Sequence, residues 1–84
     1  MEWVLCKQNA TFRLGNAPIV QIDLTQHEPT ILCDGREYYA SDWKRTDGSS
    51  GVIQEWGYRT GPIKSILVWT DRENNKWLKV YWRF

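Results

Sequence analysis

Hydrophobic and polar residues alternate through much of this 84-residue chain. The alternation is clearest over residues 76–84, Lys-Trp-Leu-Lys-Val-Tyr-Trp-Arg-Phe. Successive side chains of a strand point to opposite faces of its sheet, so this segment is predicted to be a strand with two unlike faces. The first face is apolar and consists of Leu78, Val80, Trp82 and Phe84. The second interleaves aromatic rings with positive charges and consists of Trp77, Lys79, Tyr81 and Arg83.

Short segments of similar character, bounded by turn residues, predict further strands upstream. We expect them over residues 2–7, 10–14, 18–24, 30–40, 52–59 and 63–71, the fourth being a hairpin that turns at Asp34-Gly35. The 3.6-residue repeat of a helix is nowhere sustained for more than a turn or two. Residues 41–45 could form a single helical turn capped by Ser41. Residues 46–51, Thr-Asp-Gly-Ser-Ser-Gly, are predicted to be a flexible loop.

These elements predict an all-β protein, because strands recur at spacings of roughly 8 to 12 residues with no crossover helices between them. We expect residues 1–84 to form a single domain. Its predicted architecture is a small, bent antiparallel sheet or barrel of the SH3-like or OB-like kind. A two-layer sandwich is the alternative.

The turn between the last two strands determines which side chains share a face. Residues 72–75, Arg-Glu-Asn-Asn, favour a turn of two or four residues, and either length pairs positions whose numbers have an odd sum. That register adds Leu67 and Trp69 to the apolar face and Lys64, Ile66, Val68 and Thr70 to the aromatic and basic face. The predicted core therefore consists of Leu67, Trp69, Leu78, Val80, Trp82, Val20, Ile22, Phe12 and one of Val4 or Leu5.

Composition supports a well-filled core and restricts the classes of partner. Six Trp, four Tyr and two Phe supply large apolar areas to a short chain. The net charge is +1, but residues 1–56 hold five Lys or Arg against eight Asp or Glu, whereas residues 57–84 hold six against two. The basic part hints at an acidic protein or nucleic acid as partner, while the low total charge argues against non-specific duplex binding.

The two cysteines give no sign of a metal or redox site. Cys6 and Cys33 lie far apart, outside any C-x-x-C pair, and the chain holds one His. The chain begins with Met and shows neither a signal-peptide pattern nor a membrane-spanning stretch. We therefore expect a complete cytoplasmic protein without cofactor or metal, in which both cysteines are buried thiols. A disulfide between them is the alternative.

A candidate protein-binding surface lies in the middle of the chain and consists of Tyr38, Tyr39, Asp42, Trp43, Lys44 and Arg45. Trp43 stands in a polar run with no apolar neighbour that would favour its burial. Trp, Tyr and Arg are the side chains found most often as binding hot spots. Trp43 and Arg45 are thus the expected anchors for a protein partner. The competing interpretation is that Trp43 folds back as a lid on one end of the fold.

A second candidate surface is the aromatic and basic face of the last hairpin, which would hold single-stranded nucleic acid through Lys64, Trp77, Lys79, Tyr81 and Arg83. Bases stack on exposed rings while Lys and Arg neutralise phosphates. The competing interpretation is structural: Ile66 and Val68, placed on this face by the register above, would pack with Trp77 and Tyr81 under another layer.

No catalytic arrangement is evident. His27 stands in a Gln-His-Glu-Pro turn, and Asp71 and Glu73 flank Arg72 in a hairpin turn, so all three are expected to be solvated. The Gly-Ser-Ser-Gly segment, residues 48–51, lacks the Lys-Ser or Lys-Thr that completes a phosphate-binding loop. An enzyme is therefore not expected.

The leading prediction is a non-enzymatic protein-binding module, such as an adaptor, a small subunit or a phage-type inhibitor of a host protein. An open sheet edge could also bind a partner strand or support a homodimer. Residues 34–43, Asp-Gly-Arg-Glu-Tyr-Tyr-Ala-Ser-Asp-Trp, resemble the turn-and-strand piece of small chitin-binding modules, in which a surface Trp follows a glycine turn. That resemblance covers about a tenth of the chain and implies a polysaccharide ligand, whereas the expected cytoplasmic location favours a protein.

Overall fold

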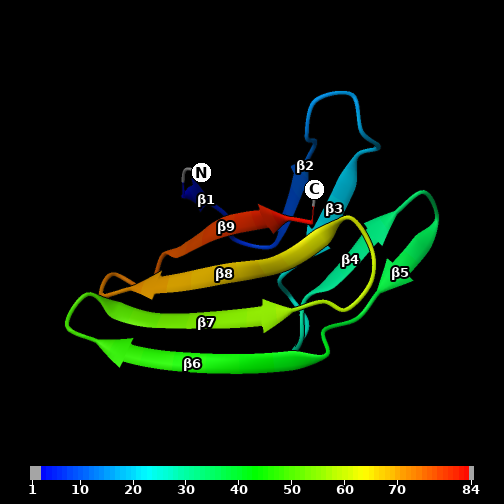
Figure 1. Ribbon diagram of the computed structural model, residues 1–84. Helices are drawn as coiled ribbons and strands as arrows, with labels where there is room; N and C mark the ends of the chain where they lie inside the picture. Colours follow the sequence, from blue (N-terminus) through cyan, green and yellow to red (C-terminus); the bar gives the residue numbers. More distant parts are fainter. Residues whose placement is uncertain (1–2, 84) are drawn as a thin grey trace.

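Nine strands form two antiparallel sheets in the computed structural model, which describes residues 3–83 (Figure 1). The five-stranded sheet has the order β1 (Val4–Leu5), β9 (Lys76–Trp82), β8 (Ile63–Asp71), β7 (Gly51–Gly57) and β6 (Asp42–Gly48). The four-stranded sheet has the order β2 (Asn9–Phe12), β3 (Val20–Asp23), β4 (Thr30–Cys33) and β5 (Arg36–Tyr38). Neighbouring strands of both sheets are consecutive in the chain, except that β1 pairs with β9.

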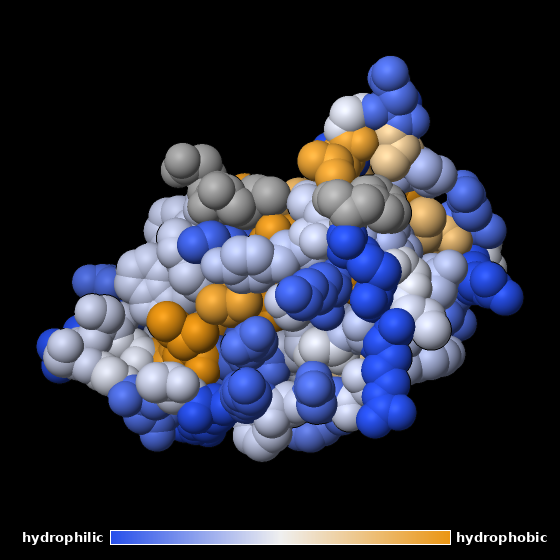
Figure 2. Space-filling model, in the orientation of Figure 1, coloured by the Kyte–Doolittle hydropathy of each residue, from blue (hydrophilic) through white to orange (hydrophobic). Residues whose placement is uncertain are grey.

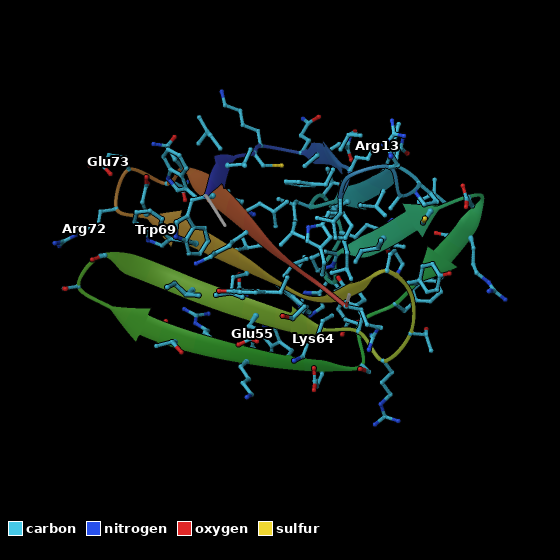
Figure 3. All side chains as sticks on the ribbon, turned by 45° about the horizontal axis from the view of Figure 1, so that its top comes forward. Arg13, Glu55, Lys64, Trp69, Arg72 and Glu73 are labelled. Carbon is cyan, nitrogen blue, oxygen red and sulfur yellow. The ribbon has the colours of Figure 1, made fainter. Side chains whose placement is uncertain are left out.

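The hydrophobic core lies between the two sheets. Its fully buried side chains are Val20, Ile22, Ile31, Ile63, Ile66, Leu78 and Val80. The four-stranded sheet covers only part of the longer sheet, and the β6–β7 and β8–β9 hairpins extend past it (Figures 1 and 3). We call the side of the five-stranded sheet that faces the core its inner face, and the opposite side its outer face.

One buried hydrogen bond ties the two sheets together. The hydroxyl of Tyr58, which follows β7, donates to the backbone carbonyl of Pro29, which precedes β4, over 2.6 Å. Tyr58 is 4% exposed, and burial raises the pKa of its phenol. The ring thus belongs to the core while its polar end is satisfied, as a buried Tyr requires.

The all-β prediction is confirmed, but the predicted barrel is wrong. Within the described residues no strand of one sheet pairs with a strand of the other, so the two sheets stay open, with edges at β1, β6, β2 and β5. The chain passes between the sheets through two short connections that lie outside the strands, residues 6–8 and 39–41. The architecture is therefore the two-layer alternative.

The helical turn that residues 41–45 could have formed is absent. Residues 3–83 contain no helix, and Asp42–Gly48 is strand β6, paired along its whole length with β7. The predicted flexible loop is reduced to Ser49 and Ser50, which turn the chain between Gly48 and Gly51. All seven residues of β6 are exposed, so no buried face imposes an alternating pattern on its sequence.

The turn between β8 and β9 has three residues, not two or four. Asp71 pairs with Asn75 through a 2.9 Å bond from its amide to the Asn75 carbonyl, and the Asn74 amide donates to the Asp71 carbonyl over 3.0 Å. Asn74 has a φ of +68° and is therefore the left-handed residue that is typical of the last position of a three-residue hairpin loop. Paired positions therefore have even sums, as in Ile66↔Val80 and Val68↔Leu78.

This register moves two of the predicted core residues, Leu67 and Trp69, out of the core. Leu78 and Val80 are buried as predicted, and so are Val20 and Ile22, while Phe12 and Trp82 are partly buried against the core. Leu67 and Trp69 lie on the outer face, and Ile66 and Val68 take their places inside. Val4 and Leu5 are both exposed, and Cys6 is buried next to them. Phe84 lies outside the described residues.

The cysteines are free thiols, as predicted. Cys6 and Cys33 are both buried, 4% and 8% exposed, and neither is in a disulfide. Burial raises the pKa of both thiols, so they stay protonated at neutral pH and pack as small apolar groups.

Candidate functional site

Trp43 stands beside a groove at the junction of the two sheets. The segment 24–29 lies against the inner face of the five-stranded sheet and leaves a hollow of about 140 Å³. The hollow is lined by Leu24, Gln26, His27, Glu28, Pro29, Trp43, Gln54, Trp56, Val68 and Lys76. We call it the Trp43 groove. Its apolar walls include Trp56 and Val68, and Trp43, which is 51% exposed, is open to a partner.

The six residues of the predicted protein-binding surface do not share one face. Trp43 pairs with the buried Trp56, so Trp43 and Arg45 project from the inner side of β6, whereas Asp42 and Lys44 project from the outer side. This division follows from the strand that replaces the predicted helical turn.

The two tyrosines of that surface also separate. Tyr39 is 66% exposed in the connection between β5 and β6. Tyr38 packs against the core, and its ring lies so close to Gly61 that a Cβ there would be 2.8 Å from it. Tyr38 is therefore a structural residue, and Tyr39 remains available for contact.

The inner side of β6 carries an exposed ion pair. Arg45 Nε donates to Asp47 Oδ1 over 2.9 Å, with the two side chains 51% and 68% exposed. Such a pair contributes little to stability because water screens it. Both groups keep most of their surface free for other contacts.

Aromatic rings gather on the outer face of the five-stranded sheet. Trp69 and Trp77 are paired neighbours on β8 and β9, with ring centroids 5.9 Å apart and an interplanar angle of 27°. Trp3 meets Trp69 edge-on at 5.7 Å. The Lys79 ammonium lies 5.6 Å from the Trp3 ring centre and 5.5 Å from that of Tyr81. Figure 2 views this face and shows apolar side chains at the surface between paler aromatic groups and charged ones.

The indole groups of this cluster are fixed by hydrogen bonds within the chain. Trp69 Nε1 donates to the Ser50 carbonyl over 3.0 Å, and Trp77 Nε1 donates to Asp71 Oδ2 over 2.9 Å. The bond from Trp77 lowers the pKa of Asp71. Asp71 also accepts hydrogen bonds from the backbone amides of Glu73 and Asn75, so this carboxylate stabilises the turn.

Four of the five predicted nucleic-acid-binding residues share the outer face. Trp77, Lys79 and Tyr81 alternate along β9. Lys64, labelled in Figure 3, lies at a bulge in β8 and lines a shallow hollow together with Tyr81. Arg83 has a different role, because its guanidinium donates to the backbone carbonyls of Gly61 and Tyr58. Arg83 therefore stabilises the connection between β7 and β8.

The surroundings of this face also differ from the prediction. Ile66, Val68 and Thr70 project from the inner side, so the face is not the buried layer that Ile66 and Val68 suggested. Its charges are balanced: the outward positions hold Lys44, Lys64 and Lys79 against Asp42, Glu55 and Asp71. An open aromatic face with little net charge results.

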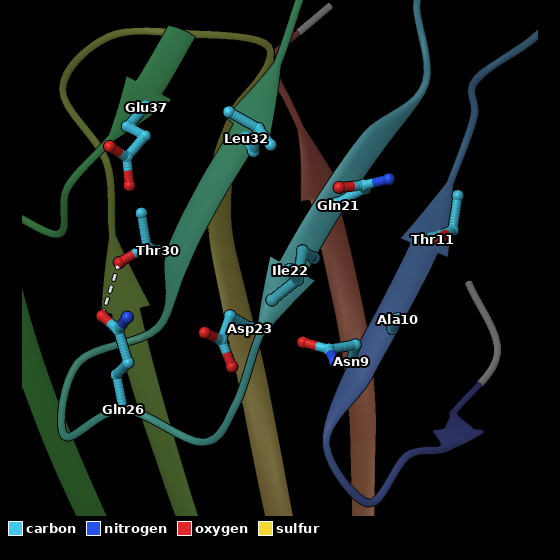
Figure 4. Close-up of a pocket in the computed structure, with 10 residues that line it drawn as sticks. All are labelled: Asn9, Ala10, Thr11, Gln21, Ile22, Asp23, Gln26, Thr30, Leu32 and Glu37. Atoms are coloured by element: carbon cyan, nitrogen blue, oxygen red, sulfur yellow. Dashed lines mark hydrogen bonds between the residues drawn. The ribbon is translucent and has the colours of Figure 1, made fainter. Parts of the chain in front are cut away.

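Sequence reasoning missed a polar hollow on the four-stranded sheet. It measures about 380 Å³ and is lined by Asn9, Ala10, Thr11, Gln21, Ile22, Asp23, Gln26, Thr30, Leu32 and Glu37 (Figure 4). Thr30 donates to Gln26 over 3.0 Å at one side, and hydrogen bonds from Thr25 lower the pKa of Asp23. These side chains come from four short strands and one loop, so no single segment of sequence signals the hollow.

No group of three or more His, Cys, Asp and Glu side chains in residues 3–83 is placed to hold a metal ion. No helix of the described part is long and apolar enough to cross a membrane. No family model matches the sequence, and neither a curated protein nor a solved structure matches it.

Proposed function

We propose that the chain is a small, non-enzymatic protein-binding module that holds its partner at the Trp43 groove. The observation that carries this proposal is the exposure of Trp43, a large aromatic side chain with half of its surface in water at the mouth of a groove. Burying the exposed part of an indole releases a large apolar area from water, which is why Trp is so frequent among hot spots. An adaptor, a small subunit and an inhibitor of another protein could all use such a surface.

The composition of the groove supports a protein partner. Stable interfaces combine an apolar centre with a polar rim that excludes water. Trp43, Trp56 and Val68 provide the apolar centre, and the polar groups around them are Gln26, His27, Glu28, Gln54 and Lys76. Charges of both signs at the rim suit the mixed surface of another protein.

Replacing Trp43 and Arg45 together with Ala is expected to abolish recovery of the partner in a pull-down from the native host. Both side chains are exposed and project from the same side of β6, so the variant should fold normally. Leu32→Ala is the matched control, because Leu32 is 38% exposed on the other sheet. Equal recovery of the same partner by wild type and by the folded double variant would exclude the Trp43 groove.

A second candidate function is the binding of single-stranded nucleic acid by the outer face of the five-stranded sheet. The observation in its favour is that Trp77, Lys79, Tyr81 and Lys64 share a face that the second sheet leaves open. Base stacking on one ring contributes about 1 to 3 kcal/mol, so a short strand needs few charged contacts. The balanced charge of the face makes this the weaker candidate.

A mixed-sequence single strand of RNA or DNA should then quench Trp fluorescence at low salt. The salt dependence should be shallow, because few phosphates would be neutralised. The Lys79→Ala, Tyr81→Ala double variant should bind more weakly, whereas Lys7→Ala, which removes an exposed charge outside the face, should not. Absence of quenching in wild type with both kinds of strand would exclude this function.

A further inference from the structure

Strand β6 forms a free edge of the five-stranded sheet. It is last in the strand order, and all seven of its residues, Asp42–Gly48, are exposed. An unpaired edge offers backbone N–H and C=O groups to another strand, and charged side chains usually discourage such pairing. In β6 the charges can instead select one pairing with a second copy, because each side of the strand carries one negative and one positive side chain: Asp42 and Lys44 on the outer side, Arg45 and Asp47 on the inner side.

Symmetry restricts how two copies of β6 can pair. In an antiparallel pair with a two-fold axis, the axis is perpendicular to the sheet, so inner side chains meet inner side chains. Facing positions must then have an even sum, and each register is centred on one residue that faces its own copy. Charge and overlap decide among these registers.

Most registers place like charges opposite each other. Centring on Lys44, Arg45 or Asp47 would face that side chain with its own copy, which is destabilising. Centring on Trp43 would pair only residues 42–44 of the strand, whereas centring on Thr46 pairs residues 44–48. The Thr46 register alone combines the longer overlap with opposite charges.

We propose that the chain forms a homodimer in which β6 pairs antiparallel with β6 of a second copy about Thr46. Arg45 of each copy then faces Asp47 of the other, twice across the axis. Arg45 and Asp47 already form a 2.9 Å ion pair on the inner side, so in the dimer each carboxylate lies between two guanidinium groups. On the outer side the two Thr46 side chains face each other, and Thr–Thr is a favourable cross-strand pair.

The dimer goes beyond the proposed function and leaves the Trp43 groove open. Trp43 faces Ser49 of the second copy, a small residue in the turn after β6. The two Trp43 residues lie six positions apart along the paired strands, about 20 Å at the usual rise per residue. A continuous ten-stranded sheet would thus present two equivalent grooves on one side. Trp43→Ala alone, which keeps Arg45 and Asp47, should remove partner binding and leave the dimer intact.

Sedimentation equilibrium over a range of concentrations, at low salt, tests the pairing. Wild type should dimerise, and Arg45→Asp or Asp47→Arg alone should raise the dimer dissociation constant about tenfold or more, because each change faces like charges across the axis. The double variant Arg45→Asp, Asp47→Arg restores opposite charges and should recover most of the wild-type affinity. A mixture of the two single variants should form a heterodimer more tightly than either variant associates with itself.

A pair of matched substitutions distinguishes a charge added at the two-fold axis from the same charge added elsewhere on the surface. Thr46→Lys would face two ammonium groups at the axis and should weaken the dimer, whereas Thr60→Lys adds the same charge at an exposed site outside β6 and should not. Circular dichroism verifies that each variant is folded. A monomeric wild type at millimolar concentration would overturn the proposal. So would single charge variants that dimerise as tightly as wild type.

Discussion

Replacing Ile66 with Ala is expected to lower the free energy of unfolding by about 2 to 5 kcal/mol. Ile66 is fully buried and pairs with Val80, which is fully buried as well, so the truncation leaves a cavity between the two sheets that cannot be filled by small movements. Small domains have a total stability of about 5 to 15 kcal/mol. The variant should therefore unfold at a much lower urea concentration, measured by Trp fluorescence and circular dichroism.

The matched control is the next residue in the chain. Leu67→Ala removes a side chain of the same size class, but Leu67 lies half-buried on the outer face opposite Lys79. Its removal uncovers less apolar area and leaves no enclosed cavity, so the loss should be clearly smaller. A larger loss for Leu67→Ala than for Ile66→Ala would mean that β8 presents its other face to the core.

This pair of residues marks the limit of what the sequence could predict about the C-terminal hairpin. Alternation predicted both strands correctly, because a period of two is visible without knowing the partner. The length of the loop decides which side chains of β8 share a face with those of β9. A loop that is one residue longer or shorter moves every side chain of β8 to the opposite face. Asn74 and Asn75 are both acceptable in the left-handed region, and the sequence does not distinguish which of them adopts it.

Strand β6 was missed for a different reason. A strand is recognised from sequence by one buried face, and β6 has none, since all its residues are exposed. Its pairing with β7 is maintained by backbone hydrogen bonds and by the tight turn at Ser49 and Ser50. Local reading of Ser-Asp-Trp-Lys-Arg therefore favoured a short helical turn, and only the tertiary pairing overrides it.

Candidate site residues were easier to choose than to group. Trp43 stood out because a Trp in a polar run has no local reason to be buried, and it is indeed half exposed. Arg83 was grouped with the aromatic face by alternation, yet its guanidinium reaches back to carbonyls more than twenty residues earlier. Contacts of that kind form only when the fold brings distant segments of the chain together, and no short segment of sequence indicates them.

The second large effect is expected for Gly51→Ala, which should lower the free energy of unfolding by about 2 to 4 kcal/mol. Gly51 has a φ of +126°, a region that residues with a side chain rarely adopt. A Cβ at this position would also overlap the backbone carbonyl oxygen of Thr70 on β8. Because Gly51 begins β7 and pairs with Asp71, relief of the overlap would separate β7 from β8 at the hairpin tips.

Gly48→Ala provides the control within the same turn. Gly48 is the cross-strand partner of Gly51, but its φ is not positive, and the nearest atom to an added Cβ would be the Gly51 carbonyl oxygen at 3.9 Å. This substitution should change stability by no more than about 1 kcal/mol, since Ala restricts the unfolded chain without meeting an obstacle in the fold. Thermal unfolding of the two variants should separate them by well over 5 °C. Equal melting temperatures would show that β8 does not approach Gly51 as closely as the structure places it.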